Sequence, residues 1–245
     1  MEQNSAGKKR GYIIVLIVLG SLLLAASVVA HLQEDYGTYR FLRGLISFSY
    51  LAVIIWYKKS KTNILLVLFL LCYGISSFAT MAYEDKTIAM LSLMLNFVSL
   101  LFIIKALWPR ASLKNLGVTL TVVFAALIVV NGYLFYQFIT MLKDFAFGNL
   151  HYAAMILGAM ALVVCSFLSL VYNHSSSSKA SLVFTIFVFL IVFAEVFRAI
   201  AYYDFGFGNT SVYVARIIII LSTALLAHYA IMPKEPKDEV SKKLF

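Results

Sequence analysis

Residues 182–203 read LVFTIFVFLIVFAEVFRAIAYY, and this stretch predicts both the fold class and the first candidate for chemistry. At 1.5 Å per residue, a helix of this length crosses about 30 Å of hydrocarbon. The stretch also carries Glu195 and Arg198. Ionisable side chains inside a membrane are costly and usually functional. We therefore expect a transmembrane helix with a polar site near its second end.

Seven further apolar segments occupy most of the remaining chain. They lie at 12–31, 41–57, 64–83, 88–107, 116–136, 152–172 and 212–232. Of the 245 residues, 62% are hydrophobic and 13% are charged, whereas soluble domains are nearer half apolar and a quarter charged. The surplus apolar surface must face lipid. The sequence predicts an all-α protein of about eight transmembrane helices, with a cytoplasmic N-terminus (1–11), a membrane domain (12–232) and a cytoplasmic tail (233–245).

Charges in the loops predict the orientation of these helices. Most basic residues fall on the side that holds both chain ends, whereas the other side is rich in Asp and Glu. The positive-inside rule then places both termini in the cytoplasm of a multi-pass cell-membrane protein. The net charge of +9 is explained by this pattern, so nucleic acid is not an expected partner. Segment 41–57 can span only if Arg40 and Arg43 extend toward an interface at its start.

The first apolar segment has an alternative interpretation. It follows Lys8-Lys9-Arg10 and ends with Val28-Val29-Ala30, which resembles a signal-peptidase site. Its apolar run of about 19 residues is longer than the 7–15 typical of a signal peptide. A retained first helix is favoured, and cleavage before His31 stays open.

Two distant stretches resemble one another. Residues 78–85 read FATMAYED and residues 197–204 read FRAIAYYD, with four identities at an offset of 119. If this similarity reflects an internal repeat, the chain consists of two four-helix halves. Because each half has an even number of helices, the halves would be parallel and related by an axis along the membrane normal.

The candidate site centres on Glu195 as an acid, base or cation ligand. Arg198 and Tyr202 follow it on the same helix stripe, and Arg216 starts the last segment at similar depth, so the two arginines could bind a lipid phosphate. Further candidates for substrate binding are Asp204, Asp85, Ser76, Ser77 and His228. A buried Glu–Arg pair that only fixes helix packing is the alternative. No cofactor or metal is expected, because no two histidines share a helix at i, i+4 spacing.

The layout resembles the YhhN, or lysoplasmalogenase-like, membrane family. Ala194-Glu195 stands where that family carries Ser-Asp in helix seven, and Ala227-His228-Tyr229-Ala230 stands near its helix-eight tyrosine stretch. Ser76-Ser77 occupies the place of the family's helix-three Gly-Asp. The resemblance implies hydrolysis of the vinyl ether bond of lysoplasmalogens by two facing carboxylates, one of which is replaced in this chain.

Two classes of function remain open at this point. The first is an enzyme or binding protein for lysophospholipids, with membrane lipids as its partners and a polar cavity in the outer leaflet. The second is a non-enzymatic small-solute transporter, or a sensor or partner subunit of a membrane complex. The clustering of membrane charges toward one leaflet mildly disfavours transport.

Overall fold

The computed structural model describes residues 2–58, 62–112, 117–203 and 208–233, and this part of the chain contains no strand. Its eight long helices are α1 (Glu2–Leu32), α2 (Tyr36–Lys58), α3 (Ile64–Ala79), α4 (Lys86–Leu107), α5 (Val118–Met141), α6 (Asn149–Ser176), α7 (Lys179–Tyr202) and α8 (Gly208–Ile231). Short 3-10 turns follow α3 (Thr80–Ala82), α4 (Trp108–Arg110) and α5 (Lys143–Phe145). All eight described helices are long and apolar enough to span a membrane, so the predicted all-α membrane architecture is confirmed.

The start of α2 differs from the sequence-based boundary. The helix begins at Tyr36, five residues before the predicted segment, because Asp35 caps its first turn. The Asp35 carboxylate accepts a hydrogen bond of 2.9 Å from the backbone N–H of Thr38. Arg40, which lay just outside the predicted segment 41–57, is therefore inside α2 with Arg43, one turn apart on the same helix face.

Polar side chains define the starts of three other helices. Asn63 caps α3 and Asp85 caps α4, each by accepting hydrogen bonds from backbone N–H groups of the first turn. Ser178 and Ser181 form a reciprocal capping box at the start of α7. Just before it, Ser177 adopts a left-handed backbone conformation (φ 46°) that ends α6. The run of serines in this loop is thus a tight α6–α7 turn.

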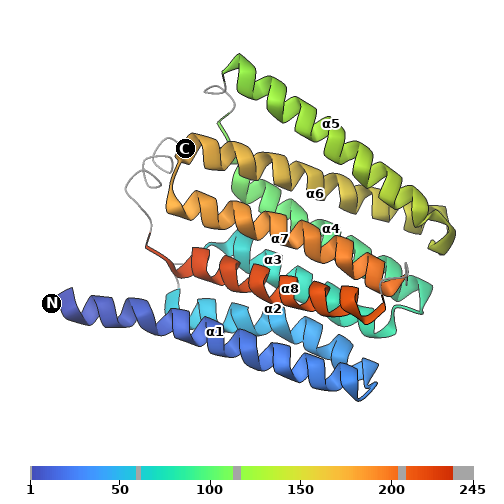
Figure 1. Cartoon of the computed structure of the whole chain (residues 1–245), viewed down its shortest axis with the longest axis horizontal. Coiled ribbons are helices and arrows are strands. Elements are labelled where there is room, and N and C mark those ends of the chain that lie inside the picture. Colours follow the sequence, from blue (N-terminus) through green and yellow to red (C-terminus); the bar gives the residue numbers. More distant parts are fainter. Residues whose placement is uncertain (1, 59–61, 113–116, 204–207, 234–245) are drawn as a thin grey trace.

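The helices run side by side (Figure 1). The two ends of the bundle differ in charge. We call one the acidic end, because its loops carry Asp35, Glu84, Asp85 and Asp144. The opposite, basic end carries Lys58, Lys105, Arg110 and Lys179. The distribution agrees with the predicted alternation of loops, since each helix crosses from one end to the other.

The centre of the bundle is formed by α3 and α7. The ring of Phe69 on α3 contacts the ring of Phe187 on α7, with centroids 5.6 Å apart, and both side chains are fully buried. Helix α2 approaches α3 closely at Gly44, where a Cβ atom would lie 2.5 Å from the ring of Phe78. Both helices also bury polar side chains, among them Ser76 and Ser77 of α3 and Thr185 and Glu195 of α7.

The packing of the helices repeats between the two halves of the chain. Helix α3 packs between α2 and α4, and α7 packs between α6 and α8. The contact of α2 with α8 has its counterpart in the contact of α6 with α4. Helices α3 and α7 therefore occupy equivalent places, as the internal sequence similarity predicts. At the offset of 119, Ser76 of α3 corresponds to Glu195 of α7.

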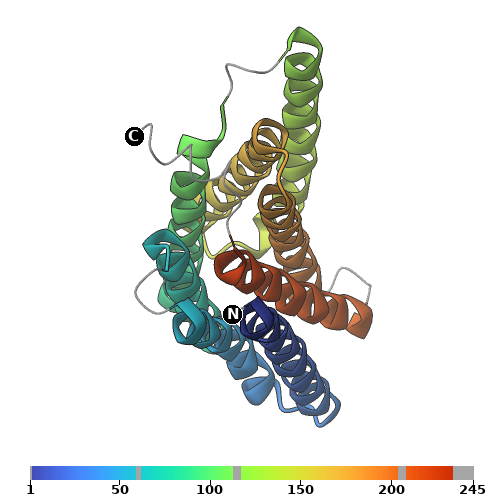
Figure 2. The same cartoon turned by 90° about the vertical axis from the view of Figure 1, so that its left-hand side faces the viewer.

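Helix α5 departs from this pattern. Its counterpart α1 packs on both α2 and α8, whereas α6 is the one long helix with which α5 makes extensive contact among the described residues. Helix α5 lies at the edge of the bundle in both views (Figures 1 and 2). Only Phe124 and Ile139 of α5 are buried. The bundle is consequently least closed around α5.

Candidate functional site

A cavity of about 360 Å³ lies within the bundle, in the half nearer the acidic end. All eight helices contribute to its lining. Its charged and amide side chains are Arg40 and Arg43 of α2, Asn96 of α4, Glu195 and Arg198 of α7, and Arg216 of α8. Glu195 lies seven residues before the end of α7, so it is roughly 10 Å from that end. The cavity thus places polar groups well inside the membrane-spanning part of the protein.

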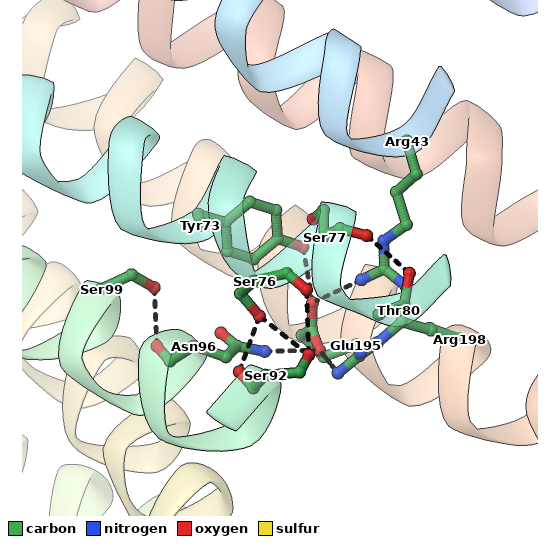
Figure 3. Close-up of polar contacts among 10 residues, drawn as sticks. All are labelled: Arg43, Tyr73, Ser76, Ser77, Thr80, Ser92, Asn96, Ser99, Glu195 and Arg198. Atoms are coloured by element: carbon green, nitrogen blue, oxygen red, sulfur yellow. Dashed lines mark hydrogen bonds and ion pairs between the residues drawn. The ribbon is translucent and has the colours of Figure 1, made fainter. Parts of the chain in front are cut away.

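Glu195 is the centre of the polar network (Figure 3). Its Oε1 accepts a hydrogen bond of 2.5 Å from the hydroxyl of Tyr73 and pairs with Arg43 Nη2 at 3.5 Å. Its Oε2 accepts a hydrogen bond of 3.0 Å from the Asn96 amide and forms a short ion pair with Arg198 Nη2. Side chains from α2, α3 and α4 therefore meet at one carboxylate on α7.

This arrangement fills the accepting capacity of Glu195. An ionised carboxylate offers about four lone-pair directions, and four donors from four residues point at this one. The side chain of Glu195 is only 7% exposed. Such a carboxylate is held ionised and fixed in place. To take a proton from a ligand, it would first have to lose one of its donors.

Arg216 lies in the same cavity but does not join the Glu195 network. Its Nη2 donates a 2.7 Å hydrogen bond to the backbone oxygen of Tyr39, and its guanidinium lies over the Tyr39 ring at 3.9 Å from the centroid. The residue is 3% exposed, and its Nη1 has no hydrogen-bond partner among the described residues. The nearby His31 also lines the cavity, with its Nδ1 unpartnered in the same part of the chain.

The opposite side of the cavity is apolar. It is lined by side chains of α4, α5 and α6, including Leu93, Phe97, Phe138 and Met155. A second, almost wholly apolar cavity of about 310 Å³ continues along α5, between it and α6 and α7. The two cavities share Phe135, Phe138 and Val196 in their walls. The site therefore combines a cationic compartment with a long apolar one.

Aromatic side chains and one ion pair surround the mouth of the cavity at the acidic end. The ring of Tyr83 packs against that of Tyr202, with centroids 5.0 Å apart. Arg40 pairs with Glu84 at 2.7 Å, and this hydrogen bond lowers the pKa of the Glu84 carboxyl below its usual value. Burial raises the pKa of the Tyr83 hydroxyl, so it stays a neutral hydrogen-bonding group at physiological pH.

The remaining candidates from the sequence lie apart from the cavity lining or outside the described residues. Ser76 is buried in a reciprocal hydrogen-bonded pair with Ser92, which joins α3 to α4, and the backbone oxygen of Ser77 accepts from Thr80. Asp85 caps α4. His228 bonds to the Tyr12 hydroxyl (3.1 Å) near the basic end, and Asp204 lies outside the described residues.

Three members of the network had no role in the predicted site. Arg43 was expected to extend to the membrane interface, and this was wrong, because its side chain is 15% exposed and points at Glu195. Tyr73 gave no signal among the many aromatic residues of the chain. Asn96, an amide in an otherwise apolar segment, was also absent from the predicted site. No group of three or more His, Cys, Asp and Glu residues suitable for a metal ion occurs in the described ranges.

Comparisons of the chain with protein-family models, with curated proteins and with solved structures find no match.

Proposed function

We propose that this protein binds a lysophospholipid, an amphiphile with one acyl chain and an anionic head group, in its intramembrane cavity. The observation that carries the proposal is the charge of the cavity. Its lining holds four arginines and one carboxylate, that of Glu195. Arg40 pairs with Glu84 outside the lining, so Arg43, Arg198 and Arg216 remain against Glu195. An isolated cavity of this charge within a membrane is costly, and an anionic ligand offsets that cost.

The shape of the site supports an amphiphile over a small polar anion. The arginines lie on one side of the cavity, and the apolar side chains of α4, α5 and α6 lie on the other. The second cavity extends the apolar surface along α5 from Phe138 to Phe124. An acyl chain placed there gains the usual stabilisation of about 0.8 kcal/mol per buried CH₂ relative to water.

Orientation follows from the loop charges. With the basic end in the cytoplasm, the cavity opens toward the outer leaflet of the membrane. A lysophospholipid in that leaflet would have its head group at the depth of the mouth. The glycerol and phosphate would need to move inward by roughly 10 Å, the depth of Glu195 on α7, to reach the arginines.

Hydrolysis is a second candidate function, and one observation favours it. The phenol of Tyr73 and the carboxylate of Glu195 adjoin the cavity 2.5 Å apart, so a proton donor and an anionic group face the same space. The resemblance to the YhhN family suggests the vinyl ether bond of a lysoplasmalogen as the target. Two features weigh against it: the four donors on Glu195, and Ser76 at the position that the offset of 119 pairs with Glu195.

Lipid binding can be tested by a substitution that fills the cavity with a larger side chain. Gly158 on α6 lines it, and a Cβ atom there would meet no other atom within 4 Å. We expect Gly158→Phe to abolish the binding of a radiolabelled lysophospholipid to purified protein in detergent. Gly132→Phe on α5 is the matched control, because Gly132 also has open space around its Cβ position but lines neither cavity.

The possible outcomes separate the functions. Saturable binding that is lost in Gly158→Phe and kept in Gly132→Phe supports the proposal. Release of a fatty aldehyde from a lysoplasmalogen, detected by mass spectrometry, would add hydrolysis. Absence of saturable lysophospholipid binding by folded wild-type protein would overturn both functions and favour a transporter or a partner subunit.

A further inference from the structure

We propose that the cavity selects a phosphomonoester head group, as in a lysophosphatidate, over a zwitterionic phosphodiester such as a lysophosphatidylcholine, and that Arg216 binds the phosphate directly. This inference rests on the proposed function and narrows its ligand class.

Arg216 differs from the other three cavity arginines in having no carboxylate partner among the described residues. Arg43 and Arg198 both pair with Glu195, so one negative charge already offsets part of theirs. Arg216 bonds only to a backbone oxygen and an aromatic ring in the described structure. Its unpartnered Nη1 is buried, and a donor left without an acceptor costs free energy until a ligand supplies one.

The surroundings of Arg216 hold it in position to bind an anion. Its hydrogen bond to Tyr39 (2.7 Å) and its stacking on the Tyr39 ring fix the plane of the guanidinium. His31 lines the same cavity, and its ring packs against the Tyr39 ring with centroids 5.3 Å apart. The unpartnered Nδ1 of His31 offers a second polar group for a phosphate oxygen.

Charge complementarity favours a dianion. Four arginines and Glu195 line the cavity, and Arg40 is paired with Glu84 at the mouth. The charges of Arg43, Arg198, Arg216 and Glu195 then sum to +2. A phosphomonoester carries about −1.5 to −2 charges at neutral pH. A zwitterionic phosphodiester carries one negative charge on the phosphate and one positive charge on the amine, so it would leave the cavity positive.

Several aromatic faces and the carboxylate at the mouth already have partners, whereas Tyr36 and Tyr202 stay 55% and 42% exposed. A quaternary ammonium is recognised by open faces of aromatic rings. The face of Tyr39 is occupied by Arg216, and the rings of Tyr83 and Tyr202 pack against each other. Glu84, the carboxylate at the mouth, is paired with Arg40.

The test compares four probes on detergent-purified wild-type protein: a lysophosphatidate, a lysophosphatidylcholine of the same acyl chain, the corresponding fatty acid and inorganic phosphate. We expect the lysophosphatidate to bind about tenfold or more tightly than the phosphatidylcholine analogue, since a charge-assisted hydrogen bond and an unmatched charge are each worth about tenfold in affinity. Inorganic phosphate should compete with the lysophosphatidate only at much higher concentration, because it lacks the chain.

Variants then assign the preference to Arg216. Arg216→Gln should remove most of the difference between the two lysolipids, and Arg216→Lys should restore part of it, because lysine keeps the charge and loses the planar donor pair. Lys105→Gln on the exposed surface of α4 is the matched control, since it removes one positive charge away from the cavity and should leave the preference unchanged.

The two proposals fail in different ways. Equal affinity for the two lysolipids, or tighter binding of the lysophosphatidylcholine, would overturn the phosphomonoester inference and leave lysophospholipid binding intact. Failure of both lysolipids to bind would overturn the proposed function. Tight binding of inorganic phosphate without any gain from an acyl chain would identify a free phosphate as the ligand and would also overturn it. If Arg216→Gln does not fold, the comparison of the four probes on wild-type protein decides the inference.

Discussion

Replacing Glu195 with glutamine removes the negative charge that Arg43 and Arg198 share, and we expect the variant to unfold much more easily than the wild type. The carboxylate is 7% exposed and bonds to side chains of three other helices. Removing one partner of a buried ion pair costs about 3–5 kcal/mol. Since the glutamine oxygen still accepts from one or two donors, we expect a loss near the lower end, about 3 kcal/mol.

Reversible unfolding in mixed micelles, followed by circular dichroism, measures this loss. Glu84→Gln is the control, because the Arg40–Glu84 pair is solvent-screened, with a Glu84 side chain that is 65% exposed. Such pairs are worth about 0–1 kcal/mol. A Glu195→Gln variant no less stable than the Glu84→Gln control would refute the idea that Glu195 anchors the helices. If it were also inactive toward a lipid substrate, Glu195 would act in catalysis.

Tyr73→Phe should destabilise the protein by about 1.5–3 kcal/mol, because it removes a hydrogen bond to a charged acceptor. Tyr50→Phe is the control, because it removes a 3.3 Å hydrogen bond to a backbone oxygen, and it should cost about 0.6 kcal/mol of stability. Equal losses of stability for the two variants in unfolding assays would contradict the special role of Tyr73. Hydrogen bonds from the backbone of α4 lower the pKa of the Asp85 carboxyl below its usual 3.8. The ionised carboxylate therefore stabilises the protein above pH 3.8. This stabilisation is lost as the pH falls through the pKa of the folded state. Melting temperatures measured from pH 6 to about 3 should therefore fall more steeply for wild type than for Asp85→Asn, and parallel curves would rule this out.

The sequence was sufficient to predict the helices because a transmembrane span has a composition that few other structures share. Helix boundaries were less predictable, as the start of α2 shows. Arg40 and Arg43 lowered the apolarity of its first turns, so they were assigned to the interface. In the structure, Arg43 is stabilised by Glu195, which is 152 residues away along the chain. A local pattern cannot reveal such a partner.

The sequence also predicted part of the candidate site. Glu195, Arg198 and Arg216 stand out because charge is rare in an apolar segment. Tyr73 does not stand out among 15 tyrosines, since an aromatic residue is ordinary in a membrane helix. Its role depends on how α3 and α7 face each other, which is tertiary information. The sequence placed Arg216 at a similar depth, but its contact with Tyr39 depends on the rotation of α8, which is also tertiary information.

The isolation of α5 also bears on how fast a ligand arrives. Leu93 and Phe97 of α4 and Phe138 and Ile139 of α5 line the cavity together, although these two helices make no extensive contact in the described structure. A lipid dissolved in the bilayer can approach this seam sideways and keep its chain in hydrocarbon throughout. The association rate would then follow the mole fraction of the ligand in the surrounding leaflet, a two-dimensional quantity. Its concentration in water would matter only through the partitioning of the lipid into the membrane.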